Sequence, residues 1–413
     1  MTASELFLGL AVFGFALSLA TWLRLRIAGA LLVPTFLVGW LRGELALQML
    51  VVEALVTAVF LAFGVHREPA GQLGLGLTAL SWALLVACHF RSVGAGRVLA
   101  AALEPLGIVP DGSVSFWHGA LRPFGFDHPD VRVIRNLEYG PVLPGDKGGR
   151  NRIDLHLPVA AKPGDRRPVL LQVHGGAWII GDKREQGRPL MTHLASRGWI
   201  CAASNYRLSP AATMPDQIVD VKRALAWLKA HVAEYGGDPE FVCITGGSAG
   251  GHLSSLAALT AGDPRFQPGF EAVDTRVEAC VPFYGVFDFL DRAGDRRFAK
   301  MADALGPRIF KCRPEENPDL WDSVCPVARV HPDAPPFFVI QGSHDSLVFR
   351  EEAERFVSLL RAASRNPVAY AELPGAQHAF EIFHSPRSAH AVRAATAFLE
   401  WVRDRSRVAG GAA

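Results

Sequence analysis

Cysteine is scarce in this sequence, and its few copies form no pattern that would hold a metal ion or a disulfide framework. There is no C-x-x-C pair and no regular spacing from histidine among the six: Cys88, Cys201, Cys243, Cys280, Cys312 and Cys325. We therefore expect no metal site. Only Cys312 and Cys325 lie in loop-like sequence, and a disulfide between them stays open because spacing does not establish its geometry.

The sequence also lacks a strong charge of one sign. Its 42 Lys and Arg residues nearly balance its 40 Asp and Glu residues, which gives a formal net charge of +2, and the basic residues form no run. Proteins that bind nucleic acid usually present a basic stretch or stripe to the phosphates. We therefore do not expect nucleic acid as a partner.

Apolar residues, by contrast, are in excess, and the excess lies in the first ninety residues. Four apolar runs follow one another with short arginine-containing turns between them, at residues 6–23, 27–41, 45–65 and 73–90. Runs of this kind are typical of helices that cross a bilayer. A buried helical bundle of a soluble domain is the alternative.

We expect residues 1–91 to form three or four transmembrane helices of a multi-pass protein, most simply in a bacterial cell membrane. The first five residues contain no Lys or Arg, which argues against a secretory signal peptide. The second run contains Pro34 and is the weakest span, so a re-entrant or interfacial helix is the alternative there. Glu53 should face other helices because a carboxylate is costly in lipid. The flanking arginines balance, so the side of the membrane on which the remaining chain lies stays open.

The pattern changes after these runs. Residues 92–130 predict a linker with a partial cap. From residue 131, strand-like runs alternate with helical patterns, which is typical of a mainly parallel sheet covered by helices on both faces. The strands are expected at 131–139, 152–157, 169–173, 199–205, 241–245, 279–284, 337–341 and 368–373, and the helices at 185–196, 216–234, 248–261, 350–363 and 388–405. The predicted fold class is α/β, with a catalytic domain at 131–408 and a disordered tail at 409–413.

The segment around Ser248 predicts a nucleophile. Residues 241–252 read FVCITGGSAGGH, which is a G-x-S-x-G pattern between an apolar strand and a helix. That context lifts the serine hydroxyl out of the sheet on a sharp turn, where glycines permit close backbone contact. A glycine-rich helix start with a capping serine is the alternative.

Two strand-end loops supply a candidate acid and base. Strand 337–341 runs into the loop that carries Asp345, and strand 368–373 runs into the loop that carries His378. Both follow the nucleophile in the order acid then histidine, and the carboxyl ends of strands are where sites form in such sheets. A loop-capping carboxylate and a surface histidine are the alternatives. The rival side chains are Glu351, Glu352, His384 and His252, and we expect the last to pack locally.

A second glycine pair predicts an oxyanion hole. Strand 169–173 ends in HGGAW, residues 174–178. Backbone N–H groups of Gly175, Gly176 and Ala249 are the expected donors to the developing oxyanion. A tight strand-end turn is the alternative reading of the glycines.

Together, HGGAW, NYRLSP (205–210), YGGDP (235–239), GGSAGGH and the loops of Asp345 and His378 resemble the hormone-sensitive-lipase-like branch of the α/β-hydrolase carboxylesterases. The resemblance covers about residues 131–408. It implies an α/β-hydrolase fold and a cofactor-free, two-step acyl transfer to water. In that reaction Ser248 attacks, His378 acts as base and then acid, and Asp345 orients the histidine. Ala177 stands where the branch usually has a third glycine.

The predicted function is a membrane-attached serine carboxylesterase or lipase that acts on small-molecule or lipid-like acyl esters. An amidase or arylformamidase-like hydrolase, a membrane acyltransferase and a non-catalytic binding module remain alternatives. Trp178, Phe287 and Leu290 are candidate pocket residues, with core packing equally open. The sequence indicates neither the acyl chain length, nor the alcohol part of the substrate, nor the oligomeric state.

Overall fold

The computed structural model describes residues 1–25, 31–293 and 305–411 of the chain. Its centre is one eight-stranded sheet with the strand order β1-β2-β4-β3-β5-β6-β7-β8. Strands β1 and β4 pair antiparallel with β2, and the neighbours from β4 to β8 pair in parallel. The strands are β1 Val131–Glu138, β2 Arg152–Pro158, β3 Arg167–Val173, β4 Ile200–Ser204, β5 Gly237–Gly247, β6 Cys280–Phe283, β7 Phe337–Gly342 and β8 Val368–Leu373. All eight predicted strands are present, and the α/β fold is confirmed.

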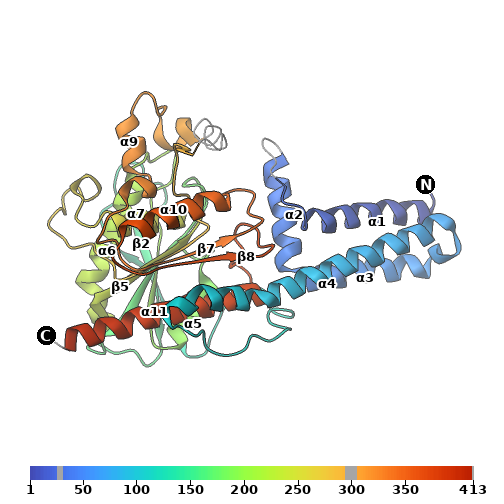
Figure 1. Cartoon of the computed structure of the whole chain (residues 1–413), viewed down its shortest axis with the longest axis horizontal. Coiled ribbons are helices and arrows are strands. Elements are labelled where there is room, and N and C mark those ends of the chain that lie inside the picture. Colours follow the sequence, from blue (N-terminus) through green and yellow to red (C-terminus); the bar gives the residue numbers. More distant parts are fainter. Residues whose placement is uncertain (26–30, 294–304, 412–413) are drawn as a thin grey trace.

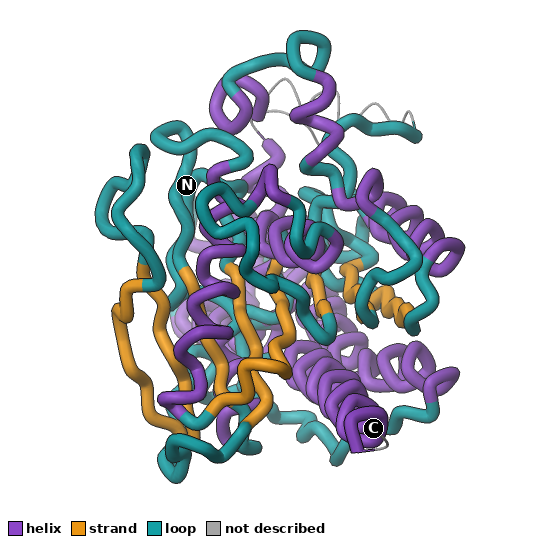
Figure 2. The backbone as a smooth tube through the Cα atoms, turned by 90° about the vertical axis from the view of Figure 1, so that its left-hand side faces the viewer, coloured by secondary structure: helices purple, strands orange, loops and turns teal. Residues whose placement is uncertain are grey.

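Helices cover both faces of the sheet (Figures 1 and 2). Successive side chains of a strand point to opposite faces, so Leu171 of β3 lies in one apolar core and Leu170 in the other. Helices α6, α7 and α10 close the first core, and α5, α11 and the end of α4 close the second. The bounds are α5 Arg188–Ser196, α6 Asp216–His231, α7 Ala249–Leu259, α9 Pro318–Ser323, α10 Arg350–Ala363 and α11 Pro386–Gly411.

The N-terminal helices project from this domain (Figure 1). Helices α1, α3 and α4 lie side by side, and α2 crosses their base; the bounds are α1 Ala3–Ala20, α2 Leu32–Glu44, α3 Ala46–Ala62 and α4 Pro69–Leu103. By length and composition α1 and α4 could each cross a membrane, and α2 with α3, which are bent by 93° at their junction, could count as a third span. Among the described residues the second apolar run therefore gives no span of its own, and the number of membrane spans stays a prediction.

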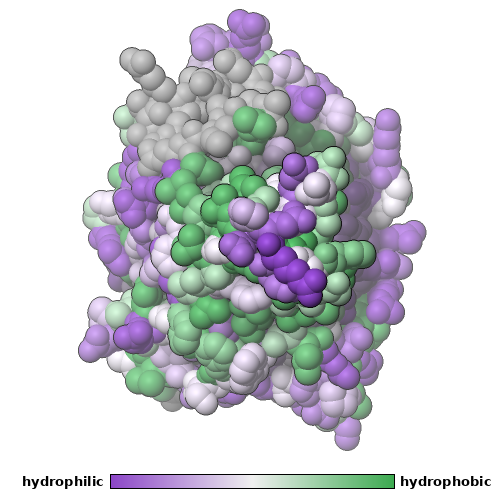
Figure 3. All heavy atoms as spheres, turned by 90° about the vertical axis from the view of Figure 1, so that its right-hand side faces the viewer, coloured by the Kyte–Doolittle hydropathy of each residue, from purple (hydrophilic) through white to green (hydrophobic). Residues whose placement is uncertain are grey.

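The sides of the projecting helices are apolar. Residues such as Phe13, Leu55 and Leu73 are more than half exposed there. Figure 3 shows apolar surface around a small polar tip. Glu53 instead faces inward, where it forms an ion pair with Arg42 (2.8 Å). The prediction that Glu53 faces other helices is confirmed.

Helix α4 runs without a break across the predicted boundary at residue 91. Its last turns bury Ala95, Leu99 and Leu103 in the core that α11 also lines. This part of the predicted linker is therefore a core helix of the catalytic domain. At the other end of the chain, α11 continues through Gly411, so residues 409–411 are helical and not a disordered tail. Residues 412–413 lie outside the described part.

Candidate active site

Ser248 lies on a strained turn between β5 and α7. Its φ of 58° and ψ of −122° are unusual for a residue with a side chain. Space explains the glycines around it: a Cβ on Gly250 would lie 2.1 Å from the Val173 carbonyl oxygen, and a Cβ on Gly246 would lie 2.5 Å from the Gly250 backbone. The Ser248 N–H donates to the Phe283 carbonyl (3.0 Å) and ties the turn to β6. The sharp strand-turn-helix connection expected from the sequence is present.

Asp345 and His378 meet at the ends of β7 and β8. The His378 Nδ1 lies 2.7 Å from the Asp345 Oδ2, and both side chains are buried. The other carboxylate oxygen accepts hydrogen bonds from the Leu347 N–H (2.9 Å) and the Val348 N–H (2.8 Å). Because backbone donors hold the carboxylate in one orientation, the imidazole is held with it, which leaves Nε2 as the atom that can exchange a proton.

The rival acids are engaged elsewhere. Glu352 is fully buried and accepts hydrogen bonds from the backbone N–H groups of Phe287 and Asp288, and burial raises its pKa well above the usual range for a carboxyl. Glu351 forms an ion pair with Arg24 (2.8 Å). Both carboxyls therefore hold neighbouring segments of the chain in place.

The rival histidines are also occupied. His252 accepts a hydrogen bond from the Trp178 indole N–H (3.2 Å) at Nδ1, and its Nε2 lies 2.8 Å from the Val324 carbonyl. Burial lowers the pKa of His252 to about 4. His384 packs against the rings of His118 and Phe126. His252 packs locally, as the sequence analysis expects.

Tyr284 lies between the nucleophile turn and the candidate base. Its ring centroid is 4.4 Å from that of His378, and a Cβ on Gly247 would lie 2.7 Å from its hydroxyl. In the described chain no hydrogen bond joins the Ser248 hydroxyl to the His378 ring. Such contacts are often loose without substrate and tighten in the reacting complex.

The backbone donors beside Ser248 differ in part from the expected set. The Gly175 N–H donates to the Gln186 Oε1 (2.7 Å), so the expectation that it faces substrate is corrected. Within the described ranges, the N–H groups of Gly176, Ala177 and Ala249 donate to no protein acceptor. Ala177 follows Gly176 with a positive φ of 51°. Ala177 was not expected as a donor, because glycine is the residue that signals close approach of the backbone to a substrate.

The three candidate pocket residues belong to the core. Trp178 is 2% exposed and Phe287 is fully buried, with its ring stacked on Phe356 at 4.2 Å. Leu290 is partly buried against the same core. The prediction that Trp178 and Phe287 line the pocket is therefore wrong.

No group of three or more possible metal ligands occurs among the residues that the structure describes. All six cysteines are free thiols, so Cys312 and Cys325 are not paired.

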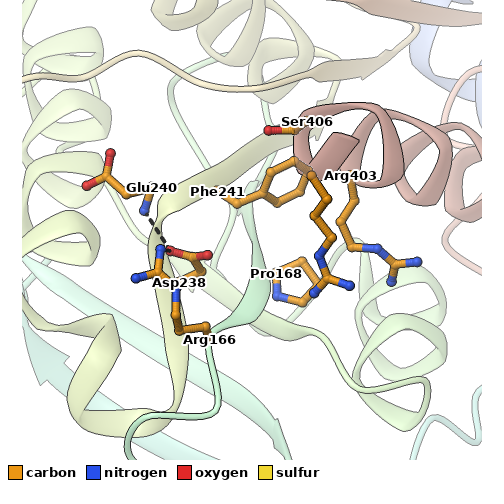
Figure 4. Close-up of a pocket in the computed structure, with 8 residues that line it drawn as sticks. Arg166, Pro168, Asp238, Glu240, Phe241, Arg403 and Ser406 are labelled. Carbon is orange, nitrogen blue, oxygen red and sulfur yellow. Dashed lines mark hydrogen bonds and ion pairs between the residues drawn. The ribbon is translucent and has the colours of Figure 1, made fainter. Parts of the chain in front are cut away.

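A cavity of about 200 Å³ lies at the amino ends of β3 and β5, beside the Arg166–Asp238 ion pair (Figure 4). That is the edge of the sheet opposite Ser248.

Glu381 is the buried carboxyl closest in sequence to His378. It accepts a hydrogen bond from the Tyr284 hydroxyl, and burial raises its pKa from 4.5 to about 7. An unfolded chain ionises this carboxyl near pH 4.5, whereas the folded chain keeps its proton until about pH 7. The stability that depends on it is therefore fully present below pH 4.5 and is lost as the pH rises to about 7.

We expect Glu381→Gln to remove the loss of stability that the wild type shows as the pH rises from 4.5 to about 7. Between pH 4.5 and 7.5, the free energy of unfolding of the wild type should fall relative to the variant by an amount on the order of 3 kcal/mol. Denaturant unfolding at a series of pH values measures it, and parallel curves for the two proteins would contradict the assignment.

Comparisons with known proteins identify the family of the chain. Residues 153–360 match the BD-FAE family, a segment that includes Ser248 and Asp345. The probable carboxylic ester hydrolase LipM of Mycobacterium tuberculosis is 47% identical over 351 residues and covers 80% of each chain. That share of this chain is more than residues 131–413 contain, so the likeness reaches back at least into α4.

Two more distant proteins extend the comparison. The isoprenylcysteine alpha-carbonyl methylesterase of Arabidopsis thaliana is 30% identical over 241 residues, which cover 56% of this chain and 53% of the relative. A solved structure, a truncated carbohydrate esterase from gut microbiota, shares the fold with a TM-score of 0.54 at 23% identity and covers 66% of this chain and 96% of that one. The chain therefore belongs to the BD-FAE family of α/β-hydrolases, fits the hormone-sensitive-lipase-like branch, and is a carboxylic ester hydrolase.

Proposed function

We propose that this esterase is attached to a membrane and hydrolyses lipid-like acyl esters through Ser248, His378 and Asp345. The observation that carries the proposal is the 2.7 Å contact between His378 and Asp345, on loops that flank the strained Ser248 turn. This is the arrangement that a serine nucleophile needs, because its hydroxyl is a weak nucleophile without an adjacent, oriented base.

The reaction follows from these positions. His378 Nε2 takes the proton of the Ser248 hydroxyl as its oxygen attacks the ester carbonyl carbon. The N–H groups of Gly176, Ala177 and Ala249 donate to the oxyanion that forms, and Ala249 adds the positive end of the α7 dipole. Collapse of the intermediate expels the alcohol, which takes the proton from His378. In the second half, His378 takes a proton from water as the water attacks the acyl-enzyme, and then returns it to the Ser248 oxygen as the acid leaves. Asp345 stays ionised throughout.

Gly175 has a supporting role in this scheme. Its N–H is bound to Gln186 (2.7 Å), and a Cβ on Gly175 would lie 3.1 Å from the Ser248 Cβ. The loop is therefore held close to the nucleophile by a side chain eleven residues further along. We therefore assign Gly175 to positioning of the loop. The N–H groups of Gly176, Ala177 and Ala249 are the donors to the oxyanion.

Two observations support a membrane and a lipid-like substrate. The sides of α1, α3 and α4 expose apolar side chains around a polar tip, and α1 and α4 are long enough to cross a bilayer. The plant relative is named as a methylesterase of isoprenylcysteine, an ester attached to a lipid-modified residue. We therefore expect an ester with an apolar chain to reach this site from the membrane surface.

Labelling with a fluorophosphonate probe tests the proposed chemistry. In washed membrane fractions, we expect wild-type protein to be labelled at Ser248 and His378→Ala to be labelled at least about 100-fold more slowly, because general-base catalysis contributes this much. Absence of labelling in folded wild-type protein would overturn the proposal.

Product analysis then separates hydrolysis from its alternatives. Release of free acid from an acyl ester, with added alcohols unacylated, supports the esterase. Acylated alcohol would indicate an acyltransferase, and faster cleavage of a formamide would indicate an amidase. Recovery of the protein in the washed membrane pellet tests the attachment independently.

A further inference from the structure

Helix α2 of the N-terminal region lies against the loop that carries His378. The ring of Phe36 is 6.0 Å from the His378 ring in an edge-to-face arrangement with an interplanar angle of 78°. Phe36 also stacks on Trp40 at 5.4 Å. Residues 36 and 40 are one helical turn apart and share a face of α2, so one face of this helix meets the candidate base.

Trp40 holds the residue that follows the base. Its indole N–H donates to the Ala379 carbonyl (2.8 Å), and its ring stacks on Phe383 at 4.6 Å. Ala379 has a φ of 63°, a left-handed conformation that is uncommon for alanine. The hydrogen bond and the stacked ring stabilise this strained turn, and the turn sets the direction in which the His378 side chain leaves the backbone.

A third contact of α2 reaches the same loop. A Cβ on Gly39 would lie 3.1 Å from the Gln377 Nε2, so the helix packs directly on the Gln377 side chain. The Gln377 Oε1 accepts hydrogen bonds from the Ser346 N–H (2.7 Å) and the His378 N–H (2.9 Å). The Gln377 side chain thereby links the loop of Asp345 to the loop of His378, and α2 packs over these hydrogen bonds.

From these contacts we propose that Trp40 and Phe36 are positioning residues for His378, so the N-terminal helices complete the active site in addition to any role as an anchor. The proposal rests on the role of His378 in the proposed function. A base acts on the serine proton only over a short distance and a narrow angle, and a displacement of about 1 Å can cost about 100-fold in rate. A helix that fixes the backbone on both sides of the base therefore controls the rate without touching the ester.

The decisive variant is Trp40→Phe, measured in the full-length protein in detergent micelles. Phenylalanine keeps an aromatic ring against Phe383 but cannot donate to the Ala379 carbonyl. We expect kcat for a short-chain nitrophenyl ester to fall about 10-fold or more while KM stays within about twofold, and the fluorophosphonate labelling rate to fall by the same factor. Phe36→Leu should lower kcat about threefold by removing the edge contact.

Trp22→Phe is the matched control. The Trp22 indole also donates to a backbone carbonyl in the helical region, that of Leu84 (3.3 Å), but its ring contacts Arg91 and not the base. We expect Trp22→Phe to lower the melting temperature by as much as Trp40→Phe does and to leave kcat unchanged.

The outcomes separate the two proposals. Wild-type kcat in both Trp40→Phe and Phe36→Leu would overturn the positioning role and leave α2 a structural element only. A wild-type protein that hydrolyses esters but is not labelled at Ser248 would instead overturn the proposed mechanism, and the positioning role with it.

Discussion

Replacing Ser248 with alanine should abolish ester hydrolysis while leaving the protein folded. The change removes the nucleophile, and the loss of one member of a serine triad costs about 10⁴- to 10⁶-fold in kcat because the remaining members cannot act without it. The site is a surface turn held by backbone contacts, since the Ser248 N–H donates to Phe283 and its side chain is only partly buried. Its hydroxyl makes no hydrogen bond within the described residues.

Kinetics and stability measured side by side test this prediction. Initial rates with a nitrophenyl ester give the loss of activity, and thermal unfolding of the same preparation gives the stability. Substitution of the glycine-bordered serine should shift the melting temperature by only a few degrees. Ser254→Ala on the same helix is a suitable control, because its hydroxyl donates to the Gly251 carbonyl (3.1 Å) and has no part in the proposed triad. Hydrolysis at the wild-type rate by Ser248→Ala would contradict the mechanism.

Glu44→Ala should cause the largest loss of stability. Glu44 ends α2 and forms an ion pair with Arg387 at the start of α11, and the side chains are 0% and 2% exposed. The Ser385 hydroxyl also donates to Glu44 (2.7 Å). Removing the carboxylate leaves the Arg387 charge buried and uncompensated, which costs about 3–5 kcal/mol.

Two comparisons make the Glu44 prediction specific. Asp333→Ala breaks an ion pair with Arg365 in which both side chains are 76% exposed, and this should cost less than about 1 kcal/mol. The double variant Glu44→Leu with Arg387→Met should be more stable than Glu44→Ala, because no charge is left unpaired. Equal melting temperatures for Glu44→Ala and Asp333→Ala would contradict this account.

The features predicted correctly from the sequence are those that depend on neighbouring residues. The Ser248 turn, the strand-end loops of Asp345 and His378, and the eight strands each have a local pattern of glycines or alternating apolar residues. Parallel strands bring their carboxyl ends to one edge of the sheet, so the order of the loops was sufficient to predict that Asp345 and His378 lie close together, and the 2.7 Å contact agrees with that placement.

The features that the sequence analysis missed depend on contacts between distant segments or on unusual backbone angles. Trp40 reaches Ala379 across 339 positions, and no spacing rule links an apolar N-terminal run to a catalytic loop. Trp178 follows the glycine pair, as a pocket residue would, but its φ of 59° turns the indole toward His252. Gly175 was expected to donate to substrate because consecutive glycines let the backbone approach closely, yet its N–H donates to the Gln186 side chain.

The unbroken course of α4 joins the projecting helices to the catalytic domain without a flexible linker. Its 35 residues extend about 50 Å, from the tip of the projecting helices to the core, where Leu99 and Leu103 are buried. If the projecting helices are anchored as we propose, a continuous helix of this kind would hold the catalytic domain at one distance from the membrane, which a flexible linker would not do. In the membrane-attached form that we propose, the enzyme would encounter esters by lateral diffusion in two dimensions. The enzyme would then select esters by the depth of their carbonyl group in the bilayer as well as by their chemical structure.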